Sequence, residues 1–272
     1  MDINETLRKI KNEFENAITT KMFNGKKYKT GSKAKEALIR SQKIINYIHE
    51  LIKKEFIDCK ISEDLIYPKV GSGKNEIKIE GFLKAKKQDI SIIPKGVFIN
   101  KKITKNNEKI LAVNIRSQLS SLKKNIDTLY ERTFAEALNL HLECLNQCLG
   151  EVYLIPTCEY DDKKMKNNKI AFKTRTDIEN YIKLFQAINN RKSIANQEYK
   201  YERICLLIVN FNQEQPKLYN SIEMLKEDGL IDSNSGLNMD NLSIDNFASD
   251  LLGIYKERFG DKELDNLKIK TT

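Results

Sequence analysis

The fold is decided by one stretch of the chain, which reads Glu76-Ile-Lys-Ile-Glu80-Gly-Phe-Leu-Lys84-Ala-Lys86-Lys-Gln88-Asp89-Ile-Ser-Ile-Ile-Pro94 and resumes as Ile110-Leu-Ala-Val-Asn114-Ile-Arg116-Ser-Gln118. Its first part alternates apolar and charged residues, a pattern typical of half-solvated strands, and predicts a charged β-hairpin. Residues 110–115 are nearly all apolar, as in a strand covered on both faces. Ser120 or Ser121 can then cap a helix whose buried stripe begins at Leu122.

The rest of the chain predicts an α/β fold around this stretch. Residues 152–155 and 204–209 read as buried strands, and a helix beginning at Asp177 lies between them. A strand, a helix and a second buried strand form a parallel crossover unit. Gly150 is expected to end the preceding strand and helix, just before the strand of residues 152–155. A last amphipathic helix is expected over about residues 245–259.

Upstream, the sequence predicts a helical N-terminal extension. Apolar residues recur at helical spacing over residues 4–17, and Ser32 can cap a long helix that runs to about Phe56. We expect residues 1–62 to form a helical region packed on a core of residues 63–272, the whole being one structural domain. A chain of 272 residues is long enough to bury such a core.

Composition narrows the function classes. The formal net charge is +9, which suits a polyanionic partner, although 38 acidic residues make the surface mixed and a low-GC genome would also enrich lysine. Five cysteines, an odd number, predict a reducing compartment rather than a disulfide framework. No run of about 18 apolar residues and no signal peptide is present, so we expect a cytoplasmic protein without a membrane partner.

The organising stretch has the residues that phosphodiester hydrolysis needs. Carboxylates that bind Mg²⁺, beside a Lys or Arg, can neutralise the phosphate and generate hydroxide from water. Asp89 is the first candidate ligand, because aspartate is disfavoured in a strand without a partner or a role. Glu80, nine residues earlier, is a second candidate carboxylate. Lys84, Lys86 and Lys87 would form a basic track for the DNA backbone, or else an ordinary solvated edge strand.

These residues resemble the PD-(D/E)XK nuclease superfamily, and within it the type II restriction endonucleases. In that superfamily an Asp begins one strand of a bent hairpin, the adjacent strand ends in an acidic residue, any residue and Lys, and a helix follows. Asp89 matches the first element, and Asn114-Ile-Arg116 matches the second in position. The resemblance implies a restriction-endonuclease-like central mixed β-sheet flanked by helices, Mg²⁺, double-stranded DNA as substrate, a homodimer and a companion DNA methyltransferase.

The chain departs from this pattern at two positions. Asn114 stands where the family has a carboxylate, and Arg116 stands where it has lysine; arginine stabilises negative charge but stays protonated. The missing carboxylate could come from Glu80 or from Glu136 on the following helix, or, in another register, from Glu108 or Glu151. The full set of predicted residues is as follows: catalytic, Asp89, Asn114, Arg116 and Gln118; metal-binding, Asp89, Glu80 and Glu136; DNA-binding, Lys84, Lys86, Lys87, Lys27 and Lys33.

Two further readings stay open. A non-catalytic DNA-binding or phage-defence protein could retain the nuclease fold with a decayed site, which Asn114 favours. Arg116 and Glu136 could also form a buried structural ion pair. The chain has only two histidines, His49 and His141, and no phosphate-binding glycine motif, which disfavours histidine-based metal sites and nucleotide-driven machines. His49 is interpreted as a packing residue.

Overall fold

A six-stranded mixed sheet forms the centre of the computed structural model, which describes residues 2–72, 76–97, 107–120 and 122–269. The three strands in its middle are parallel, and each remaining strand runs antiparallel to its inner neighbour. In spatial order the strands are β12 (Lys217–Tyr219), β11 (Arg203–Asn210), β8 (Leu149–Pro156), β7 (Leu111–Ser117), β6 (Ile90–Ile92) and β3 (Ile66–Tyr67). The predicted α/β class is therefore confirmed.

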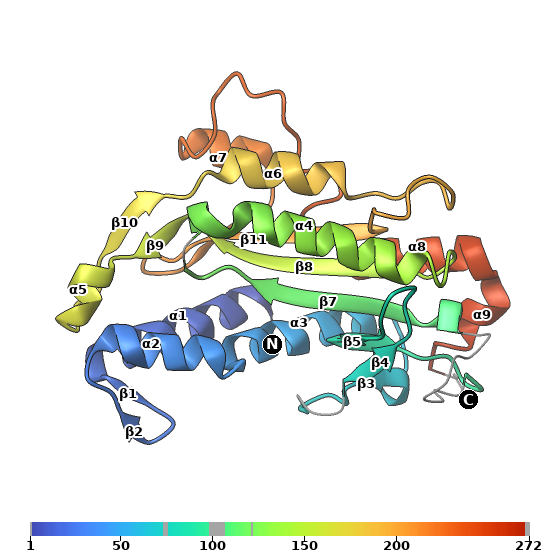
Figure 1. The fold of residues 1–272 in the computed structure, drawn as a ribbon, viewed down its shortest axis with the longest axis horizontal. Helices are drawn as coiled ribbons and strands as arrows, with labels where there is room; N and C mark the ends of the chain where they lie inside the picture. Colours follow the sequence, from blue (N-terminus) through green and yellow to red (C-terminus); the bar gives the residue numbers. More distant parts are fainter. Residues whose placement is uncertain (1, 73–75, 98–106, 121, 270–272) are drawn as a thin grey trace.

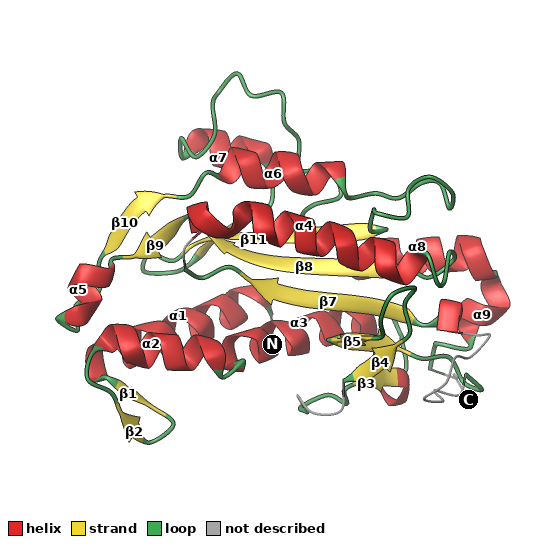
Figure 2. Ribbon diagram, viewed as in Figure 1, coloured by secondary structure: helices red, strands yellow, loops and turns green. Residues whose placement is uncertain are grey.

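Helices cover both faces of this sheet (Figures 1 and 2). One apolar cluster joins one face to α1 (Ile3–Thr20), α2 (Gly31–Arg40), α3 (Lys43–Asp58) and α8 (Phe247–Phe259). A second cluster joins the other face to α4 (Leu122–His141), α6 (Ile178–Ala187) and α7 (Ile222–Glu227). The parallel strands β7, β8 and β11 are thus buried on both sides, which is why they read as continuous apolar runs.

Two predictions about elements are wrong. The single helix expected from Ser32 to Phe56 is two helices, α2 and α3, because Gln42 adopts a left-handed backbone with φ of 64°. Gly150 does not end a unit but lies inside β8. A Cβ there would come within 2.8 Å of Leu251 and 3.0 Å of Phe247, so glycine lets α8 approach the sheet.

Smaller elements decorate the sheet. The predicted turn at residues 22–32 contains a short hairpin of β1 (Met22–Phe23) and β2 (Lys26–Lys27). The polar loop expected at residues 161–169 contains α5 (Asp162–Lys166), which lies between the paired strands β9 (Cys158–Tyr160) and β10 (Phe172–Arg175). Two 3₁₀ turns, Glu63–Leu65 and Asn107–Lys109, and the C-terminal α9 (Asp261–Asp265) complete the described elements.

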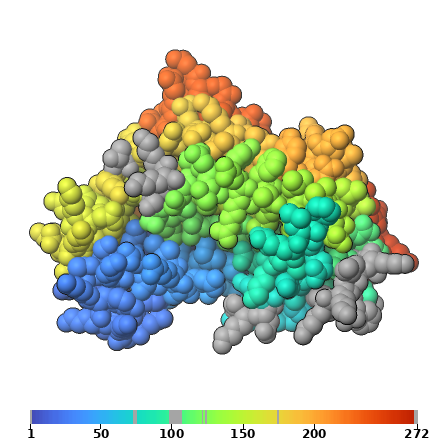
Figure 3. All heavy atoms as spheres, in the orientation of Figure 1, coloured from blue at the N-terminus to red at the C-terminus, as the bar shows by residue number. Residues whose placement is uncertain are grey.

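A charged hairpin is present as β4 (Ile77–Ile79) paired with β5 (Lys86–Gln88), a small sheet separate from the central one. Its second strand was expected at residues 90–93, but residues 90–92 form β6 of the central sheet, which pairs with β3 and β7. In Figure 3 the teal surface of the hairpin lies over the green surface of α4. The hairpin leads directly through Asp89 into β6, so the end of the hairpin and the start of a central strand meet at that residue.

The N-terminal helices and the C-terminal segment close the same side of the molecule. Ile61 pairs with Lys268 across an isolated β-bridge. The buried Lys11 ammonium donates to the carbonyl of Glu214 at 3.2 Å, in the loop after β11.

The five cysteines are free thiols. Within the described part of the chain, no helix has the length and apolar character needed to cross a bilayer.

Candidate active site

Strand β7 carries two polar side chains in an otherwise apolar run, and strand alternation directs both toward α4. Ala112 packs in the cluster that contains α4, whereas Val113 packs in the opposite one, so Asn114 and Arg116 share the face of Ala112. On β8, Glu151 is the register partner of Asn114. The sheet therefore presents three polar residues beneath the helix.

From α4, Glu136 reaches down to these residues and is the centre of their contacts. Its Oε1 accepts a hydrogen bond from Asn114 Nδ2 at 3.3 Å. Its Oε2 accepts from the Arg116 guanidinium and lies 3.3 Å from the ammonium of Lys86 on β5. A carboxylate of α4 therefore lies against Asn114 and Arg116, the two positions at which the chain departs from the family pattern.

Arg116 joins Glu136 to a second buried carboxylate. Its Nε donates to Glu151 Oε1 at 2.6 Å. Burial opposes the charge on Arg116, but Glu151 and Glu136 more than offset it and raise its pKa above the ordinary value. Burial raises the pKa of Glu151 to about 7 although Arg116 acts in the other direction, and Glu151 Oε2 is buried without a hydrogen-bond partner. A free carboxylate oxygen therefore faces the interior of the site.

Asp89 enters the site between β5 and β6. Its Oδ2 accepts the backbone N–H of Ile115 at 2.6 Å, which fixes the carboxylate against β7. Burial raises its pKa to about 6, and the carboxylates of Glu76 and Glu136 add to the shift. Its Oδ1 lies 3.8 Å from His49 Nε2, but burial lowers the pKa of His49 to about 4, so that ring is neutral at pH 7.

We call the set Asp89, Asn114, Arg116, Glu136, Glu151 and Lys86 the site cluster. It combines three carboxylates with two cations, and it becomes more exposed toward the hairpin. The side chain of Glu151 is 0% exposed and that of Glu136 is 5%, whereas Lys86 is 24% and Asp89 26% exposed. Solvent, and any ligand, would therefore approach past the β4–β5 hairpin.

Two predicted residues lie apart from the cluster. Glu80 follows β4 and is half-buried, and no hydrogen bond or ion pair among the described residues joins it to the site cluster. Gln118 is buried beyond the end of β7, where its side-chain amide donates to the carbonyl of Ser120. Glu108, the other residue considered as a carboxylate, accepts from Asn146 at 3.3 Å and belongs to a different region.

The predicted DNA-binding lysines occupy two surfaces. Lys84 and Lys87 are exposed on the hairpin, and Lys87 lies 3.5 Å from Glu76. Lys27 is exposed on β2, and Lys33 on α2 pairs with Glu36 at 2.9 Å. A further lysine-rich segment, residues 95–109, follows β6, and its residues 98–106 lie outside the described residues.

One residue of the site cluster was predicted only as an alternative carboxylate. Glu151 is a carboxylate inside the apolar strand Leu149–Pro156, where a charge needs a partner. His49 was interpreted as packing, and its ring is indeed buried, but neither ring nitrogen has a hydrogen-bond partner. A buried histidine with two unpaired nitrogens beside Asp89 could not be found from spacing alone.

In the described residues no group of three or more His, Cys, Asp or Glu side chains is arranged to hold a metal ion. In the site cluster, Arg116 bridges Glu136 and Glu151, and Lys86 lies 3.3 Å from Glu136. The donors themselves suit Mg²⁺, which prefers carboxylate and amide oxygens.

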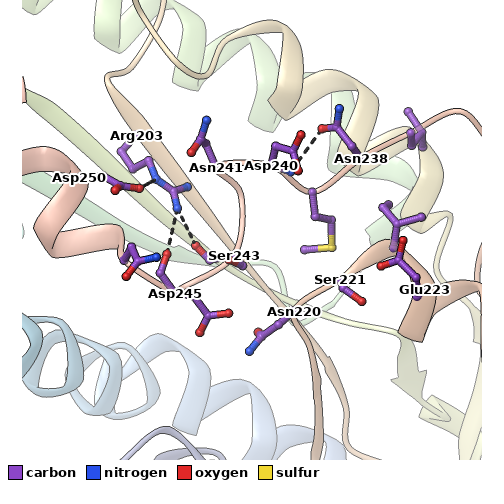
Figure 4. A pocket seen from close by; sticks show the side chains of 14 residues that line it. Arg203, Asn220, Ser221, Glu223, Asn238, Asp240, Asn241, Ser243, Asp245 and Asp250 are labelled. Atoms are coloured by element: carbon purple, nitrogen blue, oxygen red, sulfur yellow. Dashed lines mark hydrogen bonds and ion pairs between the residues drawn. The ribbon is translucent and has the colours of Figure 1, made fainter.

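Among the hollows that the described residues line, two border charged residues away from the site cluster. A cavity of about 350 Å³ borders Arg203, whose guanidinium pairs with Asp250 at 2.8 Å and donates to the carbonyls of Ser243 and Asp245 (Figure 4). Those bonds hold the loop before α8 and assign Arg203 a structural task. A larger cleft of about 940 Å³ borders Lys35, whose pKa burial lowers to about 8. Neither hollow includes a member of the site cluster.

Comparisons of the chain with protein-family models, with curated proteins and with solved structures give no match.

Proposed function

We propose that this chain is a Mg²⁺-dependent endonuclease that cuts double-stranded DNA, of the type II restriction kind. The observation that carries the proposal is the position of Glu136. It lies against both Asn114 and Arg116, where the nuclease pattern requires a carboxylate and the sequence has an amide. A helix can therefore supply the charge that the strand has lost.

The arrangement of elements supports the same proposal. Asp89 directly precedes β6, β6 pairs with β7, and β7 carries Asn114 and Arg116 before the chain enters α4. That order agrees with the resemblance drawn from the sequence. A mixed sheet between two layers of helices is also compatible with a restriction-endonuclease-like fold.

Each residue would have a distinct role. Asp89 and Glu136 would hold Mg²⁺, and Asn114 would offer a neutral oxygen and orient Glu136. When bound, Mg²⁺ neutralises the phosphate and lowers the pKa of its water. Arg116 would stabilise the charge that develops on the phosphate, because its guanidinium stays protonated. Lys86, released from Glu136, would contact the DNA backbone.

The proposal extends to the surroundings of the site. Lys84 and Lys87 would contact phosphates close to the cluster, and Lys27 and Lys33 would do so on the second basic surface. A homodimer would match a palindromic recognition sequence, and a companion DNA methyltransferase would protect the host.

The test is cleavage of unmethylated phage DNA by the purified protein, with Mg²⁺ or with EDTA. We expect discrete fragments only with Mg²⁺. Asp89→Asn and Glu136→Gln should each lower the rate by about 10²–10³-fold, the range seen when one electrostatic contact to a transition state is lost. Asp261→Asn on α9, an exposed carboxylate outside the cluster, is the matched control and should cut as the parent does.

A second candidate is favoured by Asn114 and by the two cations that neutralise Glu136: a DNA-binding protein with a decayed nuclease site. Its signature is DNA binding without cleavage at any Mg²⁺ concentration, unchanged by Asp89→Asn. That outcome would overturn the endonuclease proposal and retain the DNA-binding surfaces.

A further inference from the structure

The turn of the β4–β5 hairpin exposes two consecutive apolar side chains. Phe82 is 61% exposed and Leu83 is 81% exposed, the two highest values among the large apolar residues of the described chain. Scattered single apolar residues on a surface are ordinary, but an adjacent pair at the tip of a hairpin is a patch that a partner can cover.

This turn is held rigidly against α4. Asn139 Oδ1 accepts the backbone N–H groups of Leu83 at 2.8 Å and Lys84 at 3.2 Å, and Asn139 Nδ2 donates to the carbonyl of Lys84 at 2.9 Å. The backbone N–H of Phe82 donates to the carbonyl of Asn139 at 2.8 Å. A Cβ at Gly81 would lie 2.1 Å from Asn139 Nδ2, so only glycine permits this approach. The backbone that carries the apolar pair is thus fixed before any partner binds.

The same hairpin is basic on its exposed surface. Lys78 and Lys87 are cross-strand partners and both are exposed, and Lys84 is exposed directly after the apolar pair. Charged neighbours of this kind disfavour a second copy of the chain as the occupant, because two basic hairpins would repel each other. A polyanion with an apolar interior fits both features.

The tip also lies next to the site cluster. Asn139, which anchors the turn, follows Glu136 by three residues on α4, about one helical turn or 5 Å along the axis. On the same hairpin, Lys86 points at Glu136. A duplex whose phosphate reached Glu136 would therefore bring its grooves to Phe82 and Leu83.

We propose that Phe82 and Leu83 form a wedge that inserts between base pairs of bound DNA next to the cut phosphate, while Lys84, Lys78 and Lys87 contact the flanking backbone. Proteins that insert apolar side chains into the minor groove partly unstack a base step and bend the duplex. The inference rests on the proposed function, because it places a DNA phosphate at the site cluster. In this proposal the hairpin binds the DNA substrate and bends it.

The test uses a pool of random-sequence 30-base-pair duplexes, synthesised with 2-aminopurine in place of adenine, in EDTA so that cleavage does not interfere. Wild-type binding should increase the 2-aminopurine fluorescence, which reports unstacking. Phe82→Ser/Leu83→Ser should raise Kd roughly tenfold and abolish the fluorescence increase. The slope of log K against the logarithm of the salt concentration should not change. Lys87→Ala should instead reduce that slope by about 1.

Three controls make the result decisive. Ile170→Ser/Ile194→Ser removes two exposed apolar residues elsewhere and should bind as wild type, and Leu83→Ser alone serves if the double variant does not fold. Asp261→Asn removes an exposed carboxylate outside the site cluster and should bind with the full fluorescence increase, and EDTA makes this measurement independent of cutting. Light scattering should give the same mass for the wild type and the tip variant.

Each contrary result has one meaning. Wild-type binding without a fluorescence increase, or a tip variant that binds and unstacks DNA as the wild type does, overturns the wedge alone. A tip variant that loses a wild-type dimer shows that a second copy occupies the surface, and also overturns it. A wild-type protein that does not bind the pool also overturns the wedge, whereas the endonuclease proposal is tested separately by cleavage of phage DNA with Mg²⁺.

Discussion

Helix α4 contributes side chains to two buried clusters of charged residues, and the pKa values of their carboxylates shift in opposite directions. Glu136 belongs to the site cluster, and His141, five residues later, belongs to a group around Glu202 that also includes Arg191 and Arg258. We call this second set the Glu202 cluster. It lies where the end of α4, the start of β11 and α8 converge.

In the Glu202 cluster the charges stabilise one another. Glu202 Oε1 accepts from Arg258 at 2.7 Å and from Arg191 at 3.3 Å, and Oε2 accepts the N–H of Leu149 at 2.6 Å. Burial alone would raise the pKa of Glu202, but His141 and Arg258 lower it to about 2. One carboxylate surrounded by cations is ionised throughout the physiological range and serves the fold.

In the site cluster the acids outnumber the cations and the pKa shifts have the opposite sign. The pKa of Asp89 rises to about 6 and that of Glu151 to about 7, both mainly through burial. Holding these groups ionised at pH 8 costs folding free energy. Perturbed carboxylates near the operating pH are typical of functional sites, and the contrast with Glu202 separates the two kinds of cluster within one molecule.

The largest expected effect comes from breaking the Glu202 cluster. Glu202→Ala leaves Arg191 and Arg258 buried without their carboxylate and should lower the free energy of unfolding by about 3–5 kcal/mol, measured by urea denaturation at pH 7. Because the folded pKa is depressed, the contribution of Glu202 is present above pH 4.5 and is lost as the pH falls through about 2. An unfolding free energy within 1 kcal/mol of wild type would contradict the structural role.

The site cluster should respond in the reverse direction. Asp89→Asn keeps an oxygen for the N–H of Ile115 but removes the buried charge, so it should raise the free energy of unfolding at pH 8 by about 1–3 kcal/mol. The loss of unfolding free energy that ionised Asp89 causes in the wild type is absent below pH 3.8. It develops as the pH rises to about 6, because the pKa of Asp89 is raised in the folded state. Urea titrations at pH 4 and pH 8 would measure it. A variant less stable than wild type at pH 8 would show that Asp89 is a structural residue.

A third experiment adds charge to the site cluster. Asn114→Asp places a carboxylate where Nδ2 now donates to Glu136 at 3.3 Å, and should cost about 1 kcal/mol in EDTA through repulsion. Mg²⁺ at 100 times its Kd should then stabilise the protein by about 2.7 kcal/mol, a gain in melting temperature that EDTA reverses. Asn189→Asp, in a buried amide of the Glu202 region, is the control and should gain nothing from Mg²⁺. Equal responses would argue against a metal site.

The smallest effects distinguish the two neighbouring lysines of β5. Lys86 contacts the buried Glu136 and is 24% exposed, so Lys86→Ala should cost about 1 kcal/mol. Lys87 is 70% exposed and its pair with Glu76 is at the surface, so Lys87→Ala should cost less than about 0.5 kcal/mol. Thermal unfolding in low salt would compare them, and the reverse order would contradict the inward position of Lys86.

Much of the fold followed from local patterns. The strands β7, β8 and β11 were visible as apolar runs, and Asp177 was expected to begin α6, where its side chain accepts the N–H of Asn180. The break between α2 and α3 could not be predicted, since Gln42 is not a residue that marks a left-handed turn. Gly150 was misread because its small size serves the packing of α8, a contact across about 100 positions of sequence.

The candidate site was predictable in part. Alternation along β7 places Asn114 and Arg116 on one face. The sequence offered Glu136 as one of several carboxylates that could meet them. Glu80 was paired with Asp89 in the prediction by their spacing along the hairpin. The structure instead ends β4 at Ile79 and leaves Glu80 outside the strand. Which carboxylate completes a site depends on how the hairpin docks on α4, which neither pattern specifies.

The covering of one sheet face by α1, α3 and α8 has a consequence for synthesis of the chain. The apolar residues of β7, β8 and β11 on that face contact helices from both ends of the sequence, and Ser62 donates its N–H to Leu267. While the ribosome is still producing residues 247–259, this face lacks one of its covers. The nascent chain must therefore hold a partly covered sheet until α8 has been made, and this is the interval in which chaperones or a lower growth temperature would most increase the yield of folded protein.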